Sequence, residues 1–203
     1  LTVGNTVANV SLTGSGSSVS NAVTFGNDGT LTIGDASGDT FTFDGGLTVS
    51  TASSTLAGSI DSSNDVITFG AITLAAATTL DTNATNTTGD ITIGAITGNN
   101  NNLTLDTISS TGSASHTFTG DINLGSGALS VTGDVVLGAN VTVTATPNGG
   151  TGIAFAHAIN ADNATNNDRT LTLDAGTASN VFVVGSVGNS QPLAGLTVAQ
   201  SNG

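Results

Sequence analysis

The 203-residue sequence contains no Lys, Glu, Cys, Met, Trp or Tyr, and its one basic residue is Arg169. Several of the residues that favour helices are therefore missing or nearly so. Thr, Val and Ile, which favour strands, and Gly, Asn, Asp and Ser, which favour turns, make up much of the chain. The composition predicts an all-β protein made of strands and turns, without a helix of any length.

The lack of positive charge excludes several classes of partner. All 14 acidic residues are Asp, and the formal net charge is -13. Nucleic-acid binding requires a basic surface, and so does docking on anionic membranes. No apolar run approaches the ~20 residues of a transmembrane helix. We therefore expect neither nucleic-acid binding nor membrane insertion.

The absence of cysteine excludes disulfides and thiol chemistry. The chain is nevertheless 37% hydrophobic, and its apolar residues follow a regular period, which predicts a packed core rather than disorder. The sequence has no initiator Met and no signal peptide, so we expect a processed chain or a segment of a longer one. With no Lys and one Arg it should resist trypsin-like proteases, which suits an extracellular or cell-surface location.

A short pattern recurs along the whole chain: two apolar residues flank a central residue that is usually Thr. Because side chains alternate across a strand, the two apolar residues share a buried face and the central residue points outward. Runs rich in Gly, Asn, Asp and Ser separate these short strands. The predicted short strands are VTF (23–25), LTI (31–33), FTF (41–43), LTV (47–49), ITF (67–69), ITL (72–74), ITI (91–93), LTL (103–105), INL (122–124), LSV (129–131), VVL (135–137), VTV (141–143), IAF (153–155), LTL (171–173), VFV (181–183) and LTV (196–198).

Two stretches of the chain are nearly identical, ITFGAITLAAATTLDT (67–82) and ITIGAITGNNNNLTLDT (91–107). Other strands recur at a slightly shorter interval, and the expected neighbours are Leu47 and Ile67, Ile72 and Ile91, and Leu103 and Ile122. Such short strands at this spacing favour a solenoid over a sandwich. We predict a single domain over residues 1–203, a parallel β-helix (β-solenoid) of roughly 8–11 turns with about 18–25 residues each. Ile67 should stack on Ile91, and Phe69 on Ile93.

The interior should be a stack of Val, Leu, Ile and Phe, with the seven Phe mostly inside. TPNGG (146–150) predicts a corner, and the polar stretch NADNATNND (160–168) predicts an excursion from the coil. NNNN (99–102) aligns with LAAA (74–77) of the preceding repeat, which favours an outward-bulging polar loop over a ladder of stacked Asn side chains. The seven Phe are Phe25, Phe41, Phe43, Phe69, Phe118, Phe155 and Phe182.

The segments LTI-G, LTL-D-A-G and G-D-I-x-L-G resemble very long bacterial surface proteins of the filamentous-haemagglutinin type. VGSVGNSQPLAGLTV (184–198) is similar to a V-G-x-x-x-P-L-x-x-L-T-V element of giant repeat adhesins. The resemblance covers nearly the whole chain. It implies secretion, a right-handed parallel β-helix, an elongated rod and a role in adhesion or surface structure, and it carries over no catalytic residue. The secretion-signal domain that opens haemagglutinin-type proteins is not visible in this sequence, so the resemblance does not indicate the export route.

The sequence offers little catalytic chemistry. Polysaccharide lyases with this fold usually need a base and a cation, and inverting hydrolases need two separated carboxylates. The pairs Asp35/Asp39 and Asp61/Asp65 lie in turn-like runs, where Asp is expected to bond the local backbone. We therefore predict that the protein is not an enzyme and has no catalytic or cofactor-binding residues.

The two histidines are His116 and His157. His157 shares the parity of Ile153, Phe155 and Ile159, so we expect a neutral side chain at the edge of the core, bonded to backbone rather than to a metal. Calcium is left open as a cofactor because the loops 35–39, 61–65 and 162–168 are rich in oxygen ligands, although none fits a known calcium-loop pattern. No specific metal-binding residue is predicted.

Solenoids can also bind ice through ranks of outward Thr. The outward pairs 30/32, 40/42, 117/119, 142/144 and 170/172 would have to stack turn on turn, and their spacings are not one turn. We therefore expect that Thr serves here as a solvent-facing strand residue.

The expected function is that of an extracellular structural protein: a stiff rod that forms a subunit or segment of a bacterial surface fibre, sheath or adhesin stalk. The sequence shows no capping helix, so the open ends should stack head to tail on other copies. The alternatives are an adhesin module that binds surface glycans or host structures through corner loops such as 160–168, a β-helix enzyme that degrades polysaccharide, and an ice-binding protein.

Overall fold

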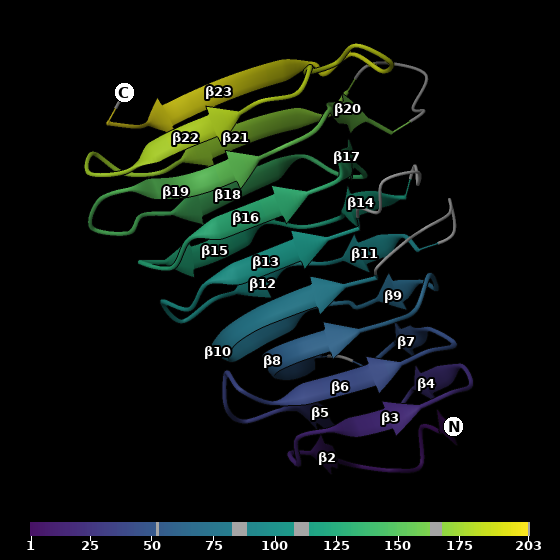
Figure 1. Ribbon diagram of the computed structural model, residues 1–203. Coiled ribbons are helices and arrows are strands. Elements are labelled where there is room, and N and C mark those ends of the chain that lie inside the picture. Colours follow the sequence, from purple (N-terminus) through teal and green to yellow (C-terminus); the bar gives the residue numbers. More distant parts are fainter. Residues whose placement is uncertain (52, 83–88, 108–113, 163–167, 203) are drawn as a thin grey trace.

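A computed structural model describes residues 1–51, 53–82, 89–107, 114–162 and 168–202, and all the regular structure in these residues is strand. The strands wind into about eight turns that stack along one axis, with the two termini at opposite ends (Figure 1). Neighbouring turns pair in parallel. The predicted all-β parallel solenoid is therefore confirmed. The described residues include no helix that is long and apolar enough to cross a membrane.

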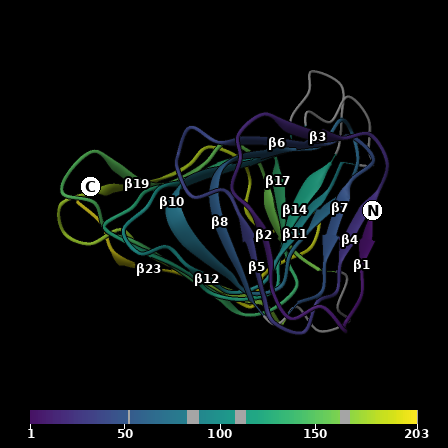
Figure 2. The same cartoon turned by 90° about the horizontal axis from the view of Figure 1, so that it is seen from below.

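Each complete turn contributes a strand to each of three faces, which are seen nearly end-on in Figure 2. The first face is the eight-stranded sheet, and the second and third faces share the fifteen-stranded sheet. They share it because β8 (Ser53–Asp61) and β10 (Ile72–Asp81) run around the corner between these two faces without a break. These two strands are longer than the short strands expected from the sequence, since their corners lie within the strand.

The strands of the first face are β1 (Thr2–Val3), β4 (Val23–Phe25), β7 (Leu47–Val49), β9 (Ile67–Thr68), β11 (Ile91–Ile93), β14 (Ser115–Phe118), β17 (Asp134–Leu137) and β20 (Ile159–Ala161). The second face consists of the first halves of β8 and β10 together with the strands β2 (Val10–Leu12), β5 (Thr30–Ile33), β12 (Ile96–Thr97), β15 (Ile122–Gly125), β18 (Val141–Ala145), β21 (Thr170–Asp174) and β23 (Gly195–Gln200). The third face consists of the second halves of β8 and β10 together with the strands β3 (Ser17–Val19), β6 (Thr40–Phe43), β13 (Leu103–Asp106), β16 (Leu129–Thr132), β19 (Thr151–Phe155) and β22 (Asn180–Val183).

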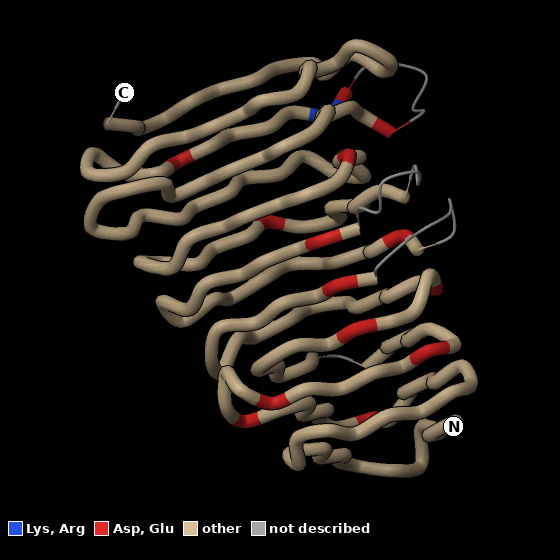
Figure 3. The backbone as a smooth tube through the Cα atoms, in the orientation of Figure 1, with Lys and Arg blue, Asp and Glu red and all other residues tan. Residues whose placement is uncertain are grey.

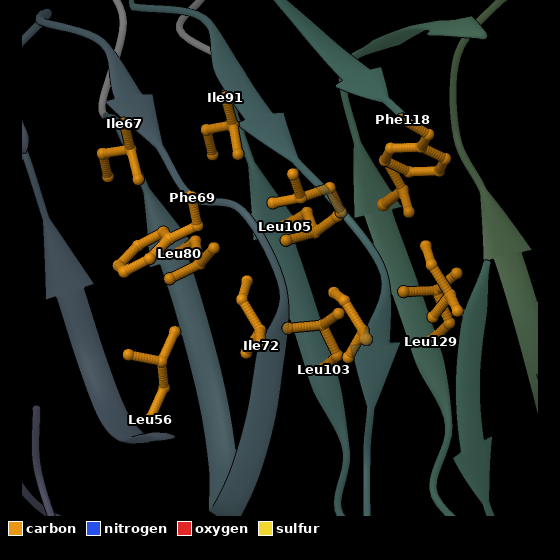
Figure 4. Close-up of a cluster of buried hydrophobic side chains, with 14 of the residues drawn as sticks. Leu56, Ile67, Phe69, Ile72, Leu80, Ile91, Leu103, Leu105, Phe118 and Leu129 are labelled. Carbon is orange, nitrogen blue, oxygen red and sulfur yellow. The ribbon is translucent and has the colours of Figure 1, made fainter. Parts of the chain in front are cut away.

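The core is built from columns of inward side chains that continue from turn to turn. Ile67 pairs with Leu47 on one side and with Ile91 on the other, as predicted, and all three are fully buried. Ile67 and Ile91 lie side by side on adjacent strands (Figure 4). Six of the seven Phe are at most 2% exposed, whereas Phe182 is 49% exposed. Phe182 points outward because its neighbours Val181 and Val183 continue the inward columns of β19.

Two of the predicted neighbours are wrong. Ile72 pairs with Ile96 rather than Ile91, and Leu103 pairs with Leu129 rather than Ile122. Each turn carries a similar short strand on all three faces, so the shorter interval used in these predictions often joins strands on different faces.

The length of a turn also varies more than predicted. One of the shortest turns leads from Ser54 to Ile72, and a much longer one leads from Val141 to Leu171. The upper limit of about 25 residues is therefore too low, because long corner loops such as 146–150 add residues without changing the strands.

The corner at 98–102 bulges outward, as predicted. Thr73 pairs with Thr97 and Thr78 with Leu103, so the segment 98–102 is one residue longer than the segment 74–77 that it faces. The Asn side chains do not stack on one another. The Nδ2 atoms of Asn99 and Asn101 donate to the carbonyl of Leu74 in the turn before, at 3.2 and 3.3 Å. Asn100 Oδ1 accepts from the amide of Ser126 in the turn after, at 3.0 Å.

One sharp corner requires glycine. Gly34 has a φ of +77°, and a Cβ at this position would lie 2.1 Å from the carbonyl oxygen of Ala57 in the next turn. A side chain would therefore meet both backbone strain and a clash with the adjacent turn.

Candidate functional site

The outward side chains of the first face form a single file of threonines. The backbone register places them at the same position of six successive turns, and each is exposed or half-buried. The file continues with Val136 and Asn160. We call its six threonines the threonine strip: Thr2, Thr24, Thr48, Thr68, Thr92 and Thr117.

A shorter file lies on the second face, where Thr32, Thr55, Thr73 and Thr97 occupy successive turns. The Thr pairs considered for ice binding are mostly not in register with each other, since residues 30 and 32 lie on the second face and residues 40 and 42 on the third. Only Thr142 and Thr172 of those pairs stack. The spacing argument is therefore right for most of those pairs, but it does not cover single threonines that stack on one face.

The third face carries a file of carboxylates instead. Asp61, Asp81 and Asp106 pair in register on three successive turns, and Thr42 and Thr132 continue the file in either direction. Figure 3 shows how the acidic residues are distributed along the rod. The file lies on a sheet face, so its spacing follows the strand separation of about 4.8 Å.

The residue that follows each of these aspartates points inward. The side chains of Ser62, Thr82 and Thr107 are at most 1% exposed. Each hydroxyl donates to a backbone carbonyl farther along its own corner: Ser62 to Asp65, Thr82 to Gly89 at 2.7 Å, and Thr107 to Ala114 at 3.3 Å. The repeated Leu-Asp-Thr thus has a buried Leu, an outward carboxylate and a hydroxyl that ties the corner leading to the first face.

Other Asp and Asn side chains connect one turn to the next. Asp90 Oδ1 accepts from the amide of Ser115 at 2.7 Å, and Asp121 Oδ1 accepts from the amide of Thr142 at 2.7 Å. The same bond joins Asp134 to Ala158, Asn9 to Thr30, Asn102 to Ala128 and Asn140 to Thr170. In every case the acceptor belongs to the earlier turn and the donor to the later one. We call these bonds turn-to-turn clamps.

The expectation that Asp in the turn-like runs bonds its local backbone is confirmed for Asp39. Asp39 Oδ2 accepts from the amides of Asp35 and Ala36 at 2.9 and 3.0 Å, and these two bonds hold the pKa of Asp39 below its usual value. Asp174 Oδ1 bonds Gly176 locally in the same way, at 2.9 Å. The clamp residues also lie at or just before the start of a strand, but their carboxylate or amide oxygens face the next turn rather than their own loop.

The three loops considered for calcium differ in how their oxygens are used. In loop 35–39 the Asp39 carboxylate accepts the loop's own amides, and in loop 61–65 the Ser62 hydroxyl bonds the backbone of Asp65. Most of loop 162–168, namely 163–167, lies outside the described residues. Within the described ranges, no group of three or more His, Cys, Asp or Glu side chains is arranged to hold a metal ion.

Arg169 forms a two-point ion pair with Asp162. Its Nη2 lies 2.7 Å from Asp162 Oδ2, and its Nε donates to Asp162 Oδ1 at 3.1 Å. The hydrogen bonds to this carboxylate raise the pKa of Arg169. The pair closes the segment between β20 and β21, which was predicted to leave the coil.

The structure places the two histidines in different environments. His157 is exposed at the corner between β19 and β20, so the prediction that it lies at the core edge is wrong. His116 is fully buried in the inward column that joins Ile91 to Val135. Its parity in Ser-His-Thr-Phe, two residues before buried Phe118, was the signal that could have located it.

The imidazole of His116 is held in its neutral form. Its Nε2 lies 3.1 Å from the carbonyl oxygen of Thr132 and 3.3 Å from the hydroxyl of Thr107, which itself donates to Ala114. Nε2 is therefore the protonated nitrogen, and it donates to Thr132. Burial in the apolar interior lowers the pKa of His116 to about 4, although the bond to Thr132 and nearby carboxylates partly oppose this shift.

A shallow pocket of about 350 Å³ lies between two corner loops near the C-terminal end, lined by residues 146–148 and 175–178 and by Gln200. None of its lining residues is charged, so the pocket can offer hydrogen bonds and small apolar groups to a ligand.

No protein-family model, curated protein or solved structure matches this chain. The similarity to filamentous-haemagglutinin-type proteins therefore stays a prediction. The stacked columns and the ends of the solenoid are the features on which a function can be argued.

Proposed function

We propose that the chain is an extracellular structural protein: a stiff β-solenoid rod that serves as a self-assembling subunit or segment of a bacterial surface fibre, sheath or adhesin stalk. The main support is the continuity of the stack. Buried columns run from Val23 to Ala175, and clamps join successive turns on all three faces. We propose no catalytic role.

The surface chemistry suits such a role. The net charge of -13 should keep rods from associating side by side in low salt. A protease that cleaves after basic residues has one target, Arg169, whose side chain is paired with Asp162. Both properties are useful to a protein that persists outside a cell.

The end turns provide surfaces for head-to-tail stacking. In β23, Leu196 and Val198 continue the inward columns of Leu171 and Leu173 but remain 48% and 50% exposed. At the other end, Val10 and Leu12 of β2 are partly buried and begin the same face. If β2 of a second copy pairs with β23, its inward Val10 and Leu12 cover the exposed apolar side chains of β23, and the strand edges gain partners. A contact of this kind does not close, so it yields filaments.

Electron microscopy and light scattering of three variants test this proposal. Leu196→Asp and Val198→Asp place a charge in the end surface and should abolish filaments, because the charge would be buried without a partner in the contact. Thr197→Asp adds the same charge to the same strand but on its outward face, and it should leave the filaments intact. Compact monodisperse particles for the unmodified chain, or equal loss in all three variants, would contradict stacking through this surface.

A second candidate function is an adhesin module that binds surface glycans through corner loops. The pocket between residues 146–148 and 175–178 favours it. Saturable binding to a glycan array that is lost on Asn148→Ala would support this function. Binding that instead disappears on deletion of 163–167 would place the glycan at the corner predicted from the sequence.

A further inference from the structure

We propose that the threonine strip of the first face binds ice. The inference is independent of filament formation, because the strip lies on the outward side of the first face, whereas filaments would form through the open strand edges of the end turns. It rests on three properties of the strip: its regular spacing, its neighbours and its lack of charge.

The spacing is imposed by the backbone. Paired strands lie about 4.7–4.9 Å apart, so the six threonines repeat at this distance along the axis. Threonine is restricted at χ1, so a regular backbone presents the hydroxyl and the methyl group in a repeated arrangement. Oxygen atoms in hexagonal ice repeat along the a axis at a spacing close to that between paired strands. Water molecules held by successive threonines can therefore occupy successive lattice positions.

The outward column on the C-terminal side of the strip is composed of small residues except at its last position. Backbone bonds from Gly26 to Val3, from Ser50 to Phe25, from Gly94 to Phe69 and from Thr119 to Ile93 continue the register one step beyond the strands. The positions on this side of the strip are therefore Gly4, Gly26, Ser50, Gly70, Gly94 and Thr119. The first five are smaller than threonine, so most of the strip stands above this column and a flat crystal face can approach it from this side.

Neither of these two columns carries a charged side chain from Thr2 to Thr119 in the turns that the structure describes. On the other side of the strip the carboxylate of Asp90 lies two residues before Thr92, and it accepts from the amide of Ser115 in the next turn. Charged groups hold a hydration shell that does not fit a crystal, whereas alternating methyl and hydroxyl groups order water without binding it tightly. The third face, with Asp61, Asp81 and Asp106 in register, lacks this property. The first face is therefore the surface of the rod best suited to ice.

The same features argue against a sugar polymer as the ligand of this face. Sugar-binding surfaces commonly stack rings on aromatic side chains, and the exposed aromatic residue Phe182 lies on the third face. Nucleic acid is excluded by the lack of basic residues. A rigid row of six weak contacts can bind a crystal lattice with useful affinity, because the remaining contacts form readily once the first is made.

The test uses the purified 203-residue chain in assays of thermal hysteresis and of ice recrystallisation. The unmodified chain should shape ice crystals and inhibit their recrystallisation. Thr68→Lys, in the middle of the strip, should reduce the inhibition by about tenfold or more, because a long charged side chain lifts the row from the lattice and breaks the simultaneous contacts. Thr68→Val keeps the shape and removes one hydroxyl, so it should give a smaller loss.

Two matched controls carry the same substitution on other faces. Thr104→Lys on the third face and Thr73→Lys in the shorter file of the second face should retain the activity of the unmodified chain. Circular dichroism and urea midpoints establish that each variant is folded, and Thr68→Val keeps the test decisive if Thr68→Lys fails to fold. An unmodified chain without hysteresis or inhibition overturns the proposal. So does equal loss with Thr104→Lys, or loss with Thr73→Lys and not with Thr68→Lys.

Discussion

The first and third faces of the rod use the same backbone for opposite surface chemistry. Both are parallel sheets with buried apolar columns beneath them. On the first face the outward file is six threonines, and on the third face it includes three aspartates on successive turns. The inward residues therefore determine that a turn stacks, and the outward residues determine what the stacked surface offers to solvent.

The largest expected effect comes from placing a carboxylate at an inward position of the first face rather than at an outward one. Ile91→Asp places a carboxylate in the buried column and should lower the free energy of unfolding by about 4 kcal/mol or more, since a buried charge without a partner is strongly unfavourable. Thr92→Asp gives the first face an outward carboxylate like that of the third face and should cost no more than about 0.5 kcal/mol. Urea unfolding followed by circular dichroism measures both. Equal costs would show that the inward and outward assignment is wrong.

A smaller effect is expected from His116, the one polar residue in its inward column of the first face from Val23 to Ile159. Its pKa of about 4 in the folded protein lies below the usual value of 6.5. Below pH 6.5 the unfolded chain takes up a proton that the folded chain refuses, so stability falls as the pH drops toward 4. Between pH 7 and pH 5 the loss should be about 2 kcal/mol.

The urea midpoint at the two pH values measures this loss. His116→Val should remove most of the decrease, because the imidazole that takes up the proton is gone. The carbonyl oxygen of Thr132 keeps a partner in this variant, since it also accepts from the amide of Thr107. His157→Ala, which changes an exposed histidine, should leave the decrease unchanged. A decrease that persists in His116→Val would assign the effect to other groups.

The smallest expected effect concerns the aspartate file of the third face. Asp81→Asn removes the middle of three carboxylates that lie in register, and like charges at such positions repel. At low salt it should stabilise the protein by about 0.5 kcal/mol, and the gain should shrink as salt screens the repulsion. Asp28→Asn, at a corner outside the file, removes the same charge. Equal gains for the two variants would assign the effect to the net charge rather than to the file.

The alternation of apolar and polar residues was enough to predict the fold and the burial of most of the short strands. It placed Ile67 on Ile91 because the similarity of those two stretches extends over more than one strand, which identifies the face as well as the interval. It misplaced Ile72 and Leu103 because similar strands occur on all three faces, and nothing within a strand such as LTL records which face it belongs to. The register depends on corner lengths, and these vary with loops that carry no apolar pattern.

The surface files were harder to predict for the same reason. Each threonine of the strip could be predicted to point outward, but their alignment required the register of all six turns. The turn-to-turn clamps escaped prediction because an Asp or Asn before a strand resembles an ordinary turn residue. Asp90 and Asp121 differ from Asp39 only in what lies beside them, which is the next turn rather than their own loop.

The clamps favour an order of folding that runs from the N-terminus to the C-terminus. Each acceptor oxygen is supplied by the earlier turn and each amide by the later one. A turn that has already formed therefore offers a side-chain acceptor to the backbone amide of the segment that follows it. A chain that becomes available from its N-terminus onward meets these acceptors in the order in which its segments appear. The same chain presented from its C-terminus would bring the amides first and leave them without partners until the earlier turn arrived.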